Sequence, residues 1–383
     1  MKKIAVVTAT RAEYGILRPL ILKLRDDVDI DLQVLVTGTH LEEKYGMTKN
    51  EIIKDKVPIH KCIPILTDGN TEYDVSIIMA NAICGFAEYF RDEHPELLIV
   101  LGDRTEILGV CAAAMNARVP IAHLHGGEIT EGAVDDCVRH AVSKMSYLHF
   151  PANESYRKRI IQMGESPERV FNVGALGVEN ILKVNLLSKE EVCNQVGIPL
   201  DKKYAVVTFH PVTLEGEDVE PQVKELTKAM DENNQYFYLI TKANADAGGD
   251  RVNQLLEAYA QSRDNVKIVA SLGMLRYLSA LKYSEFALGN SSSGIVEAPA
   301  LGIQTVNIGD RQRGRLMADT IINCDTSCDA ICKAIQQAEC TNHKPSDLYG
   351  DGHTSDKIIN VIKEFLFEEK IDLKKQFYNI NYN

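Results

Sequence analysis

Residues 101–140 read LGDRTEILGV CAAAMNARVP IAHLHGGEIT EGAVDDCVRH, and they place acidic residues directly after two predicted strands. The apolar run Leu97–Leu101 is typical of a buried parallel strand, and Pro120–His125 is the next predicted strand along the chain. Ligands of open α/β sheets bind beyond the carboxyl ends of the strands, so Asp103 and Glu128 are expected to converge on one crevice.

Two further acids, Asp135 and Asp136, begin the predicted helix over 134–145. Acidic residues in a first helical turn also complement the helix dipole, and this role accounts for Asp136. It does not account for Asp103 and Glu128, which lie on successive strand-to-helix turns. The stretch therefore predicts a cluster of carboxylates at one edge of a parallel sheet.

The totals describe a chain of two globular domains. At 383 residues it is too long for one ordinary core, and its 45% hydrophobic and 25% charged residues are typical of soluble proteins. A net charge of −12 argues against nucleic-acid or anionic-membrane partners. The N-terminal apolar run is too short for a signal peptide, and no run is long enough for a membrane span. These features predict a cytoplasmic protein.

Nine scattered cysteines, an odd number, favour reduced thiols and a cytoplasmic location. Cys324, Cys328 and Cys332 would share one helix face and could suggest a metal site. No CxxC or HExxH accompanies them, so small core residues are the favoured interpretation. His123 and His125 share one strand face, but they lack a third ligand at suitable spacing, so both are interpreted as structural histidines, with lining of the crevice as the alternative for His125.

Strand and helix patterns alternate along the chain in two series. The predicted strands are Lys3–Thr8, Asp31–Thr37, Val57–Leu66, Leu97–Leu101, Pro120–His125, Tyr147–Phe150 and Val170–Val173, then Tyr204–Phe209, Tyr236–Thr241, Asn265–Ala270, Glu285–Gly289 and Gln304–Ile308. We predict an α/β fold of two doubly wound, Rossmann-like domains facing a cleft. The domains are expected at 1–180 and 181–365, with 366–383 packing back on the first.

The second half lacks a GxGxxG or Walker A loop, but it has other groups that suit an anion. The turn Asn290–Gly294 follows a strand and opens a helix, which directs backbone N–H groups and the hydroxyls of Ser291, Ser292 and Ser293 towards the crevice. Serines are also ordinary N-caps. Glu297, one turn later, would accept hydrogen bonds from a ribose or complement the dipole.

His210 follows the strand that ends at Phe209, and Arg11 follows the first strand of the other half. An arginine, a histidine and a helix N-terminus would together form a clamp for a diphosphate. The uracil of a nucleotide is expected at Leu272 and Gly273, with Tyr277 or Leu272 packing on the ring. For Tyr277, plain packing is the simpler alternative.

These residues resemble the UDP-N-acetylglucosamine 2-epimerase superfamily, and more closely its hydrolysing branch, over about residues 3–365. The motifs that carry the resemblance are Thr10–Gly15, Leu101–Arg104, His125–Glu128, Asp135–His140, Thr208–Pro211 and Asn290–Glu297. Non-hydrolysing relatives typically have Arg-Pro-Glu at positions 11–13 and His-Arg-x-Glu at positions 210–213, and this chain departs from both. The resemblance implies a glycosyltransferase-B-like fold, UDP held mainly by the C-terminal half, no metal or cofactor, and a homodimer or homotetramer.

The reaction implied is UDP-N-acetylglucosamine plus water giving N-acetylmannosamine plus UDP, through elimination to a glycal and hydration with inversion at carbon 2. Matching the family's acids assigns Asp103, Glu128 and Asp135 as the acid/base set, with Asp136 as an alternative to Asp135. His210 joins the catalytic group because it would hold the departing diphosphate. Arg139 would pair with these acids or meet substrate.

Within the set, we hypothesise that Glu128 acts on the carbon-2 proton and Asp103 on the glycal, while Arg104 fixes Asp103. The sugar stays open between N-acetylglucosamine and the 2,4-diacetamido-2,4,6-trideoxy analogue of the legionaminic acid pathway. Three other functions are alternatives: a glycosyltransferase of the same fold, a non-catalytic nucleotide-sugar sensor and a non-hydrolysing epimerase.

Overall fold

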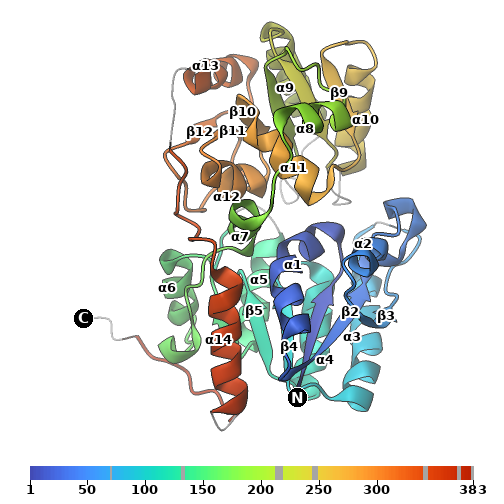
Figure 1. The fold of residues 1–383 in the computed structure, drawn as a ribbon, viewed down its shortest axis with the longest axis vertical. Coiled ribbons are helices and arrows are strands. Elements are labelled where there is room, and N and C mark those ends of the chain that lie inside the picture. The colour runs from blue at the N-terminus through green and yellow to red at the C-terminus, as the bar shows by residue number, and fades with distance from the viewer. Residues whose placement is uncertain are drawn as a thin grey trace. The chain divides into compact units, whose positions relative to one another are not determined.

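The structure, a computed structural model, describes residues 1–69, 71–130, 134–211, 219–243, 249–339, 344–368 and 372–380. Positions 131–133 of the acidic stretch and positions 212–213 of the His210 motif lie outside these ranges. The chain forms two compact units (Figure 1). Unit 1 comprises residues 1–128, 135–180 and 350–383, and unit 2 comprises residues 129–134 and 181–349.

Unit 1 is built on a six-stranded parallel sheet in the order β3-β2-β1-β4-β5-β6. Its strands are β1 (Lys2–Thr8), β2 (Ile30–Thr37), β3 (Ile59–Ile63), β4 (Leu97–Leu101), β5 (Ile121–Leu124) and β6 (Leu148–Phe150). The order reverses between β1 and β4, and this switch point is where doubly wound sheets bind ligands. The strand predicted at Val170–Val173 is not formed; Val170 makes only an isolated bridge to His149.

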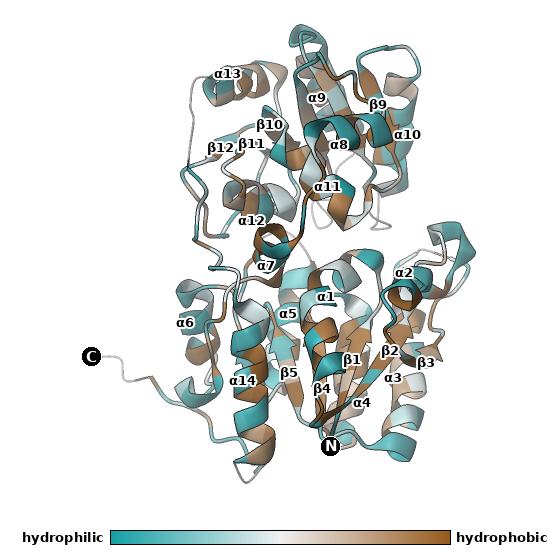
Figure 2. Ribbon diagram, in the orientation of Figure 1, coloured by the Kyte–Doolittle hydropathy of each residue, from teal (hydrophilic) through white to brown (hydrophobic). Residues whose placement is uncertain are grey.

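Helices cover both faces of this sheet. Its strands are therefore buried on both sides, which is why they are apolar along their whole length. One face packs against α1 (Arg11–Asp26) and α14 (Thr354–Phe367), and the other against α3 (Glu72–Glu93), α4 (Thr105–Asn116) and α5 (Val134–Met145). Figure 2 shows these strands as predominantly hydrophobic. The remaining helices are α2 (Lys49–Lys54), α6 (Glu154–Gln162) and α7 (Leu176–Lys183), with short 3-10 turns at Gly38–Leu41, Glu43–Tyr45 and Pro167–Arg169.

Helix α14 belongs to unit 1, whereas the sequence placed it in a domain spanning 181–365. Its apolar side chains, Ile358, Ile362, Phe365 and Leu366, are buried in the same core as the inner face of α1. The chain therefore crosses back at Gly350, fifteen residues before the expected boundary at 365. A periodic apolar face predicts that a helix is buried but does not identify the sheet that it covers.

Unit 2 repeats the design, with a six-stranded parallel sheet in the order β12-β11-β10-β7-β8-β9. Its strands are β7 (Tyr204–Thr208), β8 (Phe237–Thr241), β9 (Val266–Val269), β10 (Phe286–Gly289), β11 (Gln304–Ile308) and β12 (Ile321–Cys324). The edge strand β12 was not predicted, because it is only four residues long and is only partly buried. Here the switch point lies between β7 and β10.

The helices of unit 2 also form two layers. Helices α9 (Val219–Glu232), α10 (Gly249–Ala260) and α13 (Cys328–Glu339) cover one face of the sheet. Helices α8 (Lys189–Val196), α11 (Gly273–Lys282) and α12 (Ser292–Ala300) cover the other. Among the described residues of both units, no helix is long and apolar enough to cross a membrane.

The C-terminal residues 372–380 contact unit 1. The backbone N–H of Tyr378 donates to the carbonyl of Gly164 at 2.9 Å, and the Lys375 ammonium donates to the carbonyls of Lys144 and Ser146 at 3.0 and 2.7 Å. Lys375 also pairs with the buried carboxylate of Glu165 at 2.6 Å. The tail thus holds the C-terminal end of α5.

Candidate active site

Arg139, on α5, is the centre of the acidic cluster in unit 1. Its side chain is only 1% exposed, and its guanidinium pairs with the Asp103 carboxylate on the turn after β4. The same group donates to the backbone carbonyl of Glu128 at 3.1 Å and contacts Asp136 at 3.4 Å. One buried cation therefore joins the turn after β4, the turn after β5 and the start of α5. Such a cation offsets the repulsion between neighbouring carboxylates.

The turn after β5 holds His125 beside Glu128. The His125 Nδ1 lies 3.2 Å from a carboxylate oxygen of Glu128, whose side chain is 6% exposed. His125 has a φ of +62°, a left-handed conformation that costs free energy for a residue with a Cβ and is concentrated at functional sites. Gly127 follows at φ +78°, and a Cβ there would lie 2.5 Å from the carbonyl oxygen of Tyr156. The backbone of this turn thus aims an acid and an imidazole at each other.

His123, two residues earlier, has a structural role. The ring is fully buried between the carbonyl of Gly102, 2.7 Å from Nε2, and the hydroxyl of Ser143, 3.1 Å from Nδ1. Burial lowers the pKa of His123 to about 3, so the ring is neutral at physiological pH. It fixes the turn that carries Asp103, in agreement with the interpretation of this histidine as structural.

Glu13 is a buried acid at the switch point of unit 1 that the sequence analysis did not single out. One carboxylate oxygen accepts hydrogen bonds from the backbone N–H groups of Ala9 and Thr10 at 2.7 and 3.0 Å, which completes the capping box of α1. Burial raises the pKa of Glu13 to about 7, with Arg104 opposing and Glu106 adding to the shift. The signal in the sequence was the Thr-x-x-Glu spacing at positions 10–13.

We expect Glu13→Gln to flatten the pH dependence of stability. The folded-state pKa of about 7 lies above the ordinary 4.5, so folded protein keeps a proton that the unfolded chain loses in this window. Stability of the wild type should therefore fall as pH rises from 5 to 7. Glutamine keeps the capping geometry but does not titrate. Urea unfolding of both proteins at pH 5 and 7 checks this, and equal pH slopes would contradict the expectation.

In unit 2, Asn290 ties the turn after β10 to the turn after β7. Its side-chain oxygen accepts from the backbone N–H of His210 at 2.7 Å, and its side-chain nitrogen donates to the carbonyl of His210 at 2.8 Å. Its own carbonyl accepts from Gln312 at 2.8 Å and from Arg311 at 3.2 Å. Asn290 thus positions His210 at the switch point.

His210 is a neutral imidazole at physiological pH. Burial, with a smaller effect of the nearby Arg311 guanidinium, lowers its pKa to about 3. Its Nδ1 is buried without a hydrogen-bond partner within the described part of the chain. In the predicted diphosphate clamp, His210 would therefore act as a neutral hydrogen-bonding group. Arg311, Arg313 and Arg315, on the loop after β11, are basic groups that the sequence analysis missed; their signal was the Arg-x-Arg-x-Arg spacing directly after a strand.

Helix α12 begins at the serine turn. The Ser291 hydroxyl accepts from the backbone N–H of Ser293 at 3.3 Å and is the N-cap. A Cβ at Gly294 would lie 2.7 Å from Thr305 of β11, so glycine lets the first turn pack closely on the sheet. Ser292 is exposed, and Ser293 and Glu297 are half-buried. The turn therefore uses one serine as a cap and leaves Ser292 at the surface.

Tyr277 of α11 lies beside the serine turn, where it lines a small cavity with Thr208, Ser291 and Gly294. Burial raises the pKa of its phenol to about 12, against the opposing effect of the hydroxyls of Ser293 and Thr208. Leu272, by contrast, is buried in the hydrophobic core with residues of α8 and α12. Gly273 follows with a φ of +67°.

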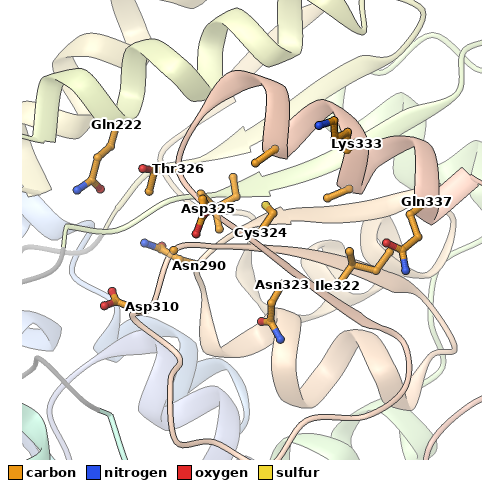
Figure 3. A pocket seen from close by; sticks show the side chains of 14 residues that line it. Gln222, Asn290, Asp310, Ile322, Asn323, Cys324, Asp325, Thr326, Lys333 and Gln337 are labelled. Atoms are coloured by element: carbon orange, nitrogen blue, oxygen red, sulfur yellow. The ribbon is translucent and has the colours of Figure 1, made fainter.

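A larger cavity of about 760 Å³ lies beyond the carboxyl ends of β10, β11 and β12 (Figure 3). Asp310, Asp325 and Lys333 are among its lining residues. It shares only Asn290 with the serine turn, and the Asn290 side chain is already engaged with His210. The cavity adds polar space beside the switch point of unit 2 but does not contain the predicted diphosphate groups.

A sequence profile of UDP-N-acetylglucosamine 2-epimerases matches residues 22–363. The chain belongs to this family. It is 39% identical over 344 residues to a GDP/UDP-N,N'-diacetylbacillosamine 2-epimerase (hydrolyzing) of Campylobacter jejuni, covering 90% of this chain and 89% of the relative. It is 36% identical over 372 residues to a UDP-N,N'-diacetylbacillosamine 2-epimerase (hydrolyzing) of Legionella pneumophila, covering 97% and 98%. The resemblance to the hydrolysing branch is confirmed, and the chain is a hydrolysing 2-epimerase of UDP-sugars.

The fold of the epimerase is confirmed by solved structures. The UDP-GlcNAc 2-epimerase of Neisseria meningitidis, in a crystal structure bound to UDP-GlcNAc, superposes with a TM-score of 0.81 at 19% identity, covering 95% of this chain and all of that one. At this identity the likeness concerns the fold alone. It agrees with the two Rossmann-like units predicted from the alternating strands and helices.

Several predicted site residues of the epimerase come together and others do not. Asp103, Glu128 and Arg139 meet in unit 1, and His210 meets the serine turn in unit 2. Asp136 contacts Arg139 and His140, each at 3.4 Å. Arg104, which was expected to fix Asp103, binds Glu106 at 2.6 Å. Arg11 pairs with Glu51 at 2.8 Å.

Proposed function

We propose that this epimerase eliminates UDP from a UDP-2-acetamido sugar and hydrates the resulting glycal with inversion at carbon 2. The observation that carries the proposal is the set of contacts that joins Asp103, Glu128, His125 and Asp136 around the buried Arg139. Removing a weakly acidic carbon-2 proton and returning one to the opposite face requires two proton-handling groups. Carboxylates in different environments can divide these roles, because neighbouring charges separate their pKa values.

Glu128 takes the carbon-2 proton as UDP leaves, and Asp103 serves the protonation or hydration of the glycal. His125, 3.2 Å from Glu128, is placed to orient this carboxylate or to relay its proton. Arg139 holds both acidic turns in position, and direct contact of Arg139 with substrate is not needed for this role. Asp135 remains the third acid of the set, with Asp136 bound to Arg139 beside it.

Unit 2 binds the UDP group. The first turn of α12 offers backbone N–H groups, the dipole of the helix favours negative charge, and Arg311 brings a guanidinium to the Asn290 carbonyl next to it. His210 contributes a neutral hydrogen-bonding ring, and Tyr277 a protonated phenol. Arg11, on the first turn of α1, is a further candidate for the phosphates once its exposed partner Glu51 is displaced. The reaction as proposed needs no metal or cofactor.

For the sugar, we favour UDP-N,N'-diacetylbacillosamine, the 2,4-diacetamido-2,4,6-trideoxy substrate. The relatives with 39% and 36% identity are named for it, whereas a Neisseria meningitidis relative named UDP-N-acetylglucosamine 2-epimerase is 32% identical. UDP-N-acetylglucosamine, which the sequence resemblance implied first, is the second candidate. Both have the same acetamido group at carbon 2, so the same acids would serve either.

Incubation with each nucleotide sugar in D₂O, followed by NMR, tests the proposal. We expect free UDP and an equal amount of the free 2-epimeric sugar with one deuterium at carbon 2, at the higher kcat/KM with the diacetamido substrate. Deuterium is expected there because the returning proton comes from solvent. A glycosyltransferase would release little sugar without an acceptor, and a non-hydrolysing epimerase would return a UDP-sugar without free UDP. Either result would overturn the proposal.

A further inference from the structure

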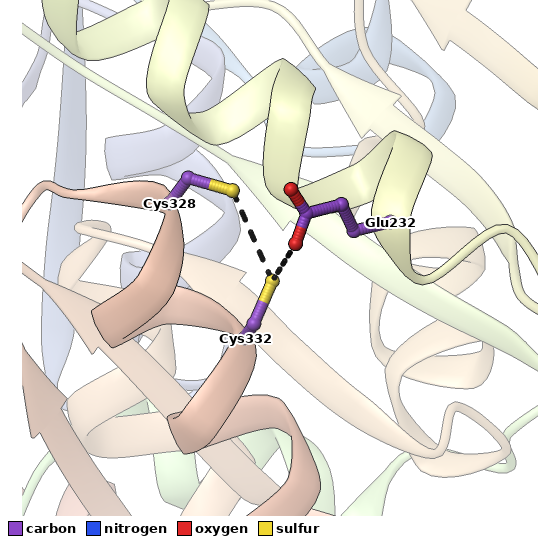
Figure 4. Close-up of side chains that lie close together, drawn as sticks. All are labelled: Glu232, Cys328 and Cys332. Atoms are coloured by element: carbon purple, nitrogen blue, oxygen red, sulfur yellow. Dashed lines mark hydrogen bonds between the residues drawn. The ribbon is translucent and has the colours of Figure 1, made fainter.

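Two cysteines and a glutamate of unit 2 form a cluster that the proposed reaction does not use. Cys328 is the first residue of α13, Cys332 lies one turn later, and Glu232 is the last residue of α9. Their ligand atoms all lie within 4.8 Å of one another. The two sulfurs are 4.0 Å apart, and the Cys332 Sγ is 3.4 Å from a Glu232 carboxylate oxygen (Figure 4).

These separations match those of a tetrahedral zinc site. Zinc binds thiolate sulfur at about 2.3 Å and carboxylate oxygen at about 2.1 Å, so tetrahedral angles place two sulfurs about 3.8 Å apart and a sulfur and an oxygen about 3.6 Å apart. The observed 4.0 and 3.4 Å differ from these values by about 0.2 Å, which small rotations of the side chains would absorb. The backbone therefore already places the three ligands.

The surroundings hold the cluster and favour soft cations. The Asn233 side-chain nitrogen donates to the Cys332 sulfur at 3.3 Å, a contact that orients the ligand and would stabilise a thiolate. Glu225 accepts from the backbone N–H of Cys328 at 2.7 Å and fixes the start of α13. Two sulfur ligands select zinc-class cations over calcium or magnesium, which prefer oxygen.

A disulfide between the two cysteines is disfavoured by geometry. Residues four apart on a helix have Cβ atoms about 5–6 Å apart, whereas a disulfide needs about 3.5–4.5 Å.

We propose that Cys328, Cys332 and Glu232 form a binding site for one thiophilic divalent cation of the zinc class. Solvent completes the fourth position, because the described residues supply three ligands. The cation would join the end of α9 to the first turn of α13, two helices that pack on the same face of the sheet of unit 2. The site is independent of the proposed epimerase reaction, since none of its ligands belongs to the acidic cluster or to the serine turn.

Titration of the reduced, metal-free full-length chain with Co²⁺ tests this proposal, followed by competition with Zn²⁺ against a chromophoric chelator. We expect one equivalent of Co²⁺ to give a thiolate-to-cobalt charge-transfer band and tetrahedral d–d bands, which one equivalent of Zn²⁺ abolishes. Cys332→Ser should lose the two-thiolate spectrum, and the exposed Glu232→Gln should weaken Zn²⁺ binding at least tenfold while leaving the fold intact. Zn²⁺ should raise Tm in the wild type but not in Cys332→Ser.

Cys324→Ser is the matched control. Cys324 lies on β12, in the same four-residue spacing as the two ligand cysteines, but its sulfur is outside the cluster. This variant should bind Co²⁺ and Zn²⁺ as the wild type does. The proposal is overturned if the charge-transfer band keeps its full wild-type intensity in Cys332→Ser, if Glu232→Gln binds Zn²⁺ with unchanged affinity, or if no band develops in the wild type.

Discussion

Glu128→Gln and Asp103→Asn are each expected to slow the release of UDP from the nucleotide sugar by about 10²–10⁴-fold, the usual cost of removing a positioned acid or base. Both amides are close in shape to the acids they replace, and the predicted UDP-binding residues other than Arg11 lie in unit 2. The affinity for UDP, measured by calorimetry, should therefore stay within a few-fold of the wild type. Steady-state release of UDP gives kcat.

The two variants differ in what else they change. Glu128→Gln leaves the backbone carbonyl that accepts from Arg139, whereas Asp103→Asn removes the carboxylate that pairs with Arg139. Asp136→Asn is the matched control, because Asp136 also contacts Arg139 but carries no step of the proposed proton transfer, which uses Glu128 and Asp103. If Asp136→Asn lost as much activity as Asp103→Asn, disturbance of Arg139 would explain both losses. Near-normal turnover of Glu128→Gln would remove Glu128 from the mechanism.

The sequence predicted the parts of the site that depend on local pattern. The continuous apolar run Leu97–Leu101 could only be a strand buried on both faces, and the turn after such a strand lies at the ligand-binding edge. This reasoning placed Asp103 and Glu128 on adjacent turns, where Leu101 and Leu124 are paired in the sheet. Strand ends are thus informative because the carboxyl ends of parallel strands lie at the same edge of the sheet, so residues that follow neighbouring strands come close together.

The features that the sequence did not predict depend on contacts between distant residues. Arg139 pairs with Asp103, which is 36 residues away, and its burial cannot be deduced from its own helix. The neutral state of His210 results from its burial, and its backbone is held by Asn290, 80 residues further on. The pairing of β12 with β11 and the packing of α14 on the sheet of unit 1 likewise depend on contacts with residues that are distant in the sequence. Hydrophobic periodicity predicts that one face of a helix is buried, but it does not identify the element that packs against that face.

The second large expected effect concerns the stability of the fold and involves Glu165, a buried carboxylate that Lys375 of the C-terminal tail contacts. The Glu165 side chain is 1% exposed and binds Lys144 and Lys375 at 2.6 Å and His149 at 3.1 Å. Burial alone would raise the pKa of Glu165, but hydrogen bonds from His149, Lys144 and Lys375 lower it to about 2. The carboxylate therefore stabilises the folded state by on the order of 3 kcal/mol above the ordinary pKa of 4.5.

We expect Glu165→Gln to lower the free energy of unfolding by about 3 kcal/mol at pH 7, because a neutral amide cannot balance the charges of Lys144 and Lys375. The folded-state pKa is depressed, so the difference from the wild type should shrink as pH falls from 5 towards 2. Urea unfolding followed by circular dichroism measures this. Glu154→Gln, which breaks an exposed pair with Arg157, is the control and should cost less than about 1 kcal/mol.

Measuring the turnover of Glu165→Gln distinguishes a structural role of Glu165 from a catalytic one. Glu165 binds the last turn of α5 through Lys144, whereas Arg139 lies more than one turn earlier on that helix. Below its unfolding transition, Glu165→Gln should therefore release UDP at close to the wild-type rate, although it unfolds at lower urea concentration. A kcat reduced 10²-fold with unchanged stability would contradict this assignment. A loss of stability that did not vary with pH would show that Glu165 does not act through its charge.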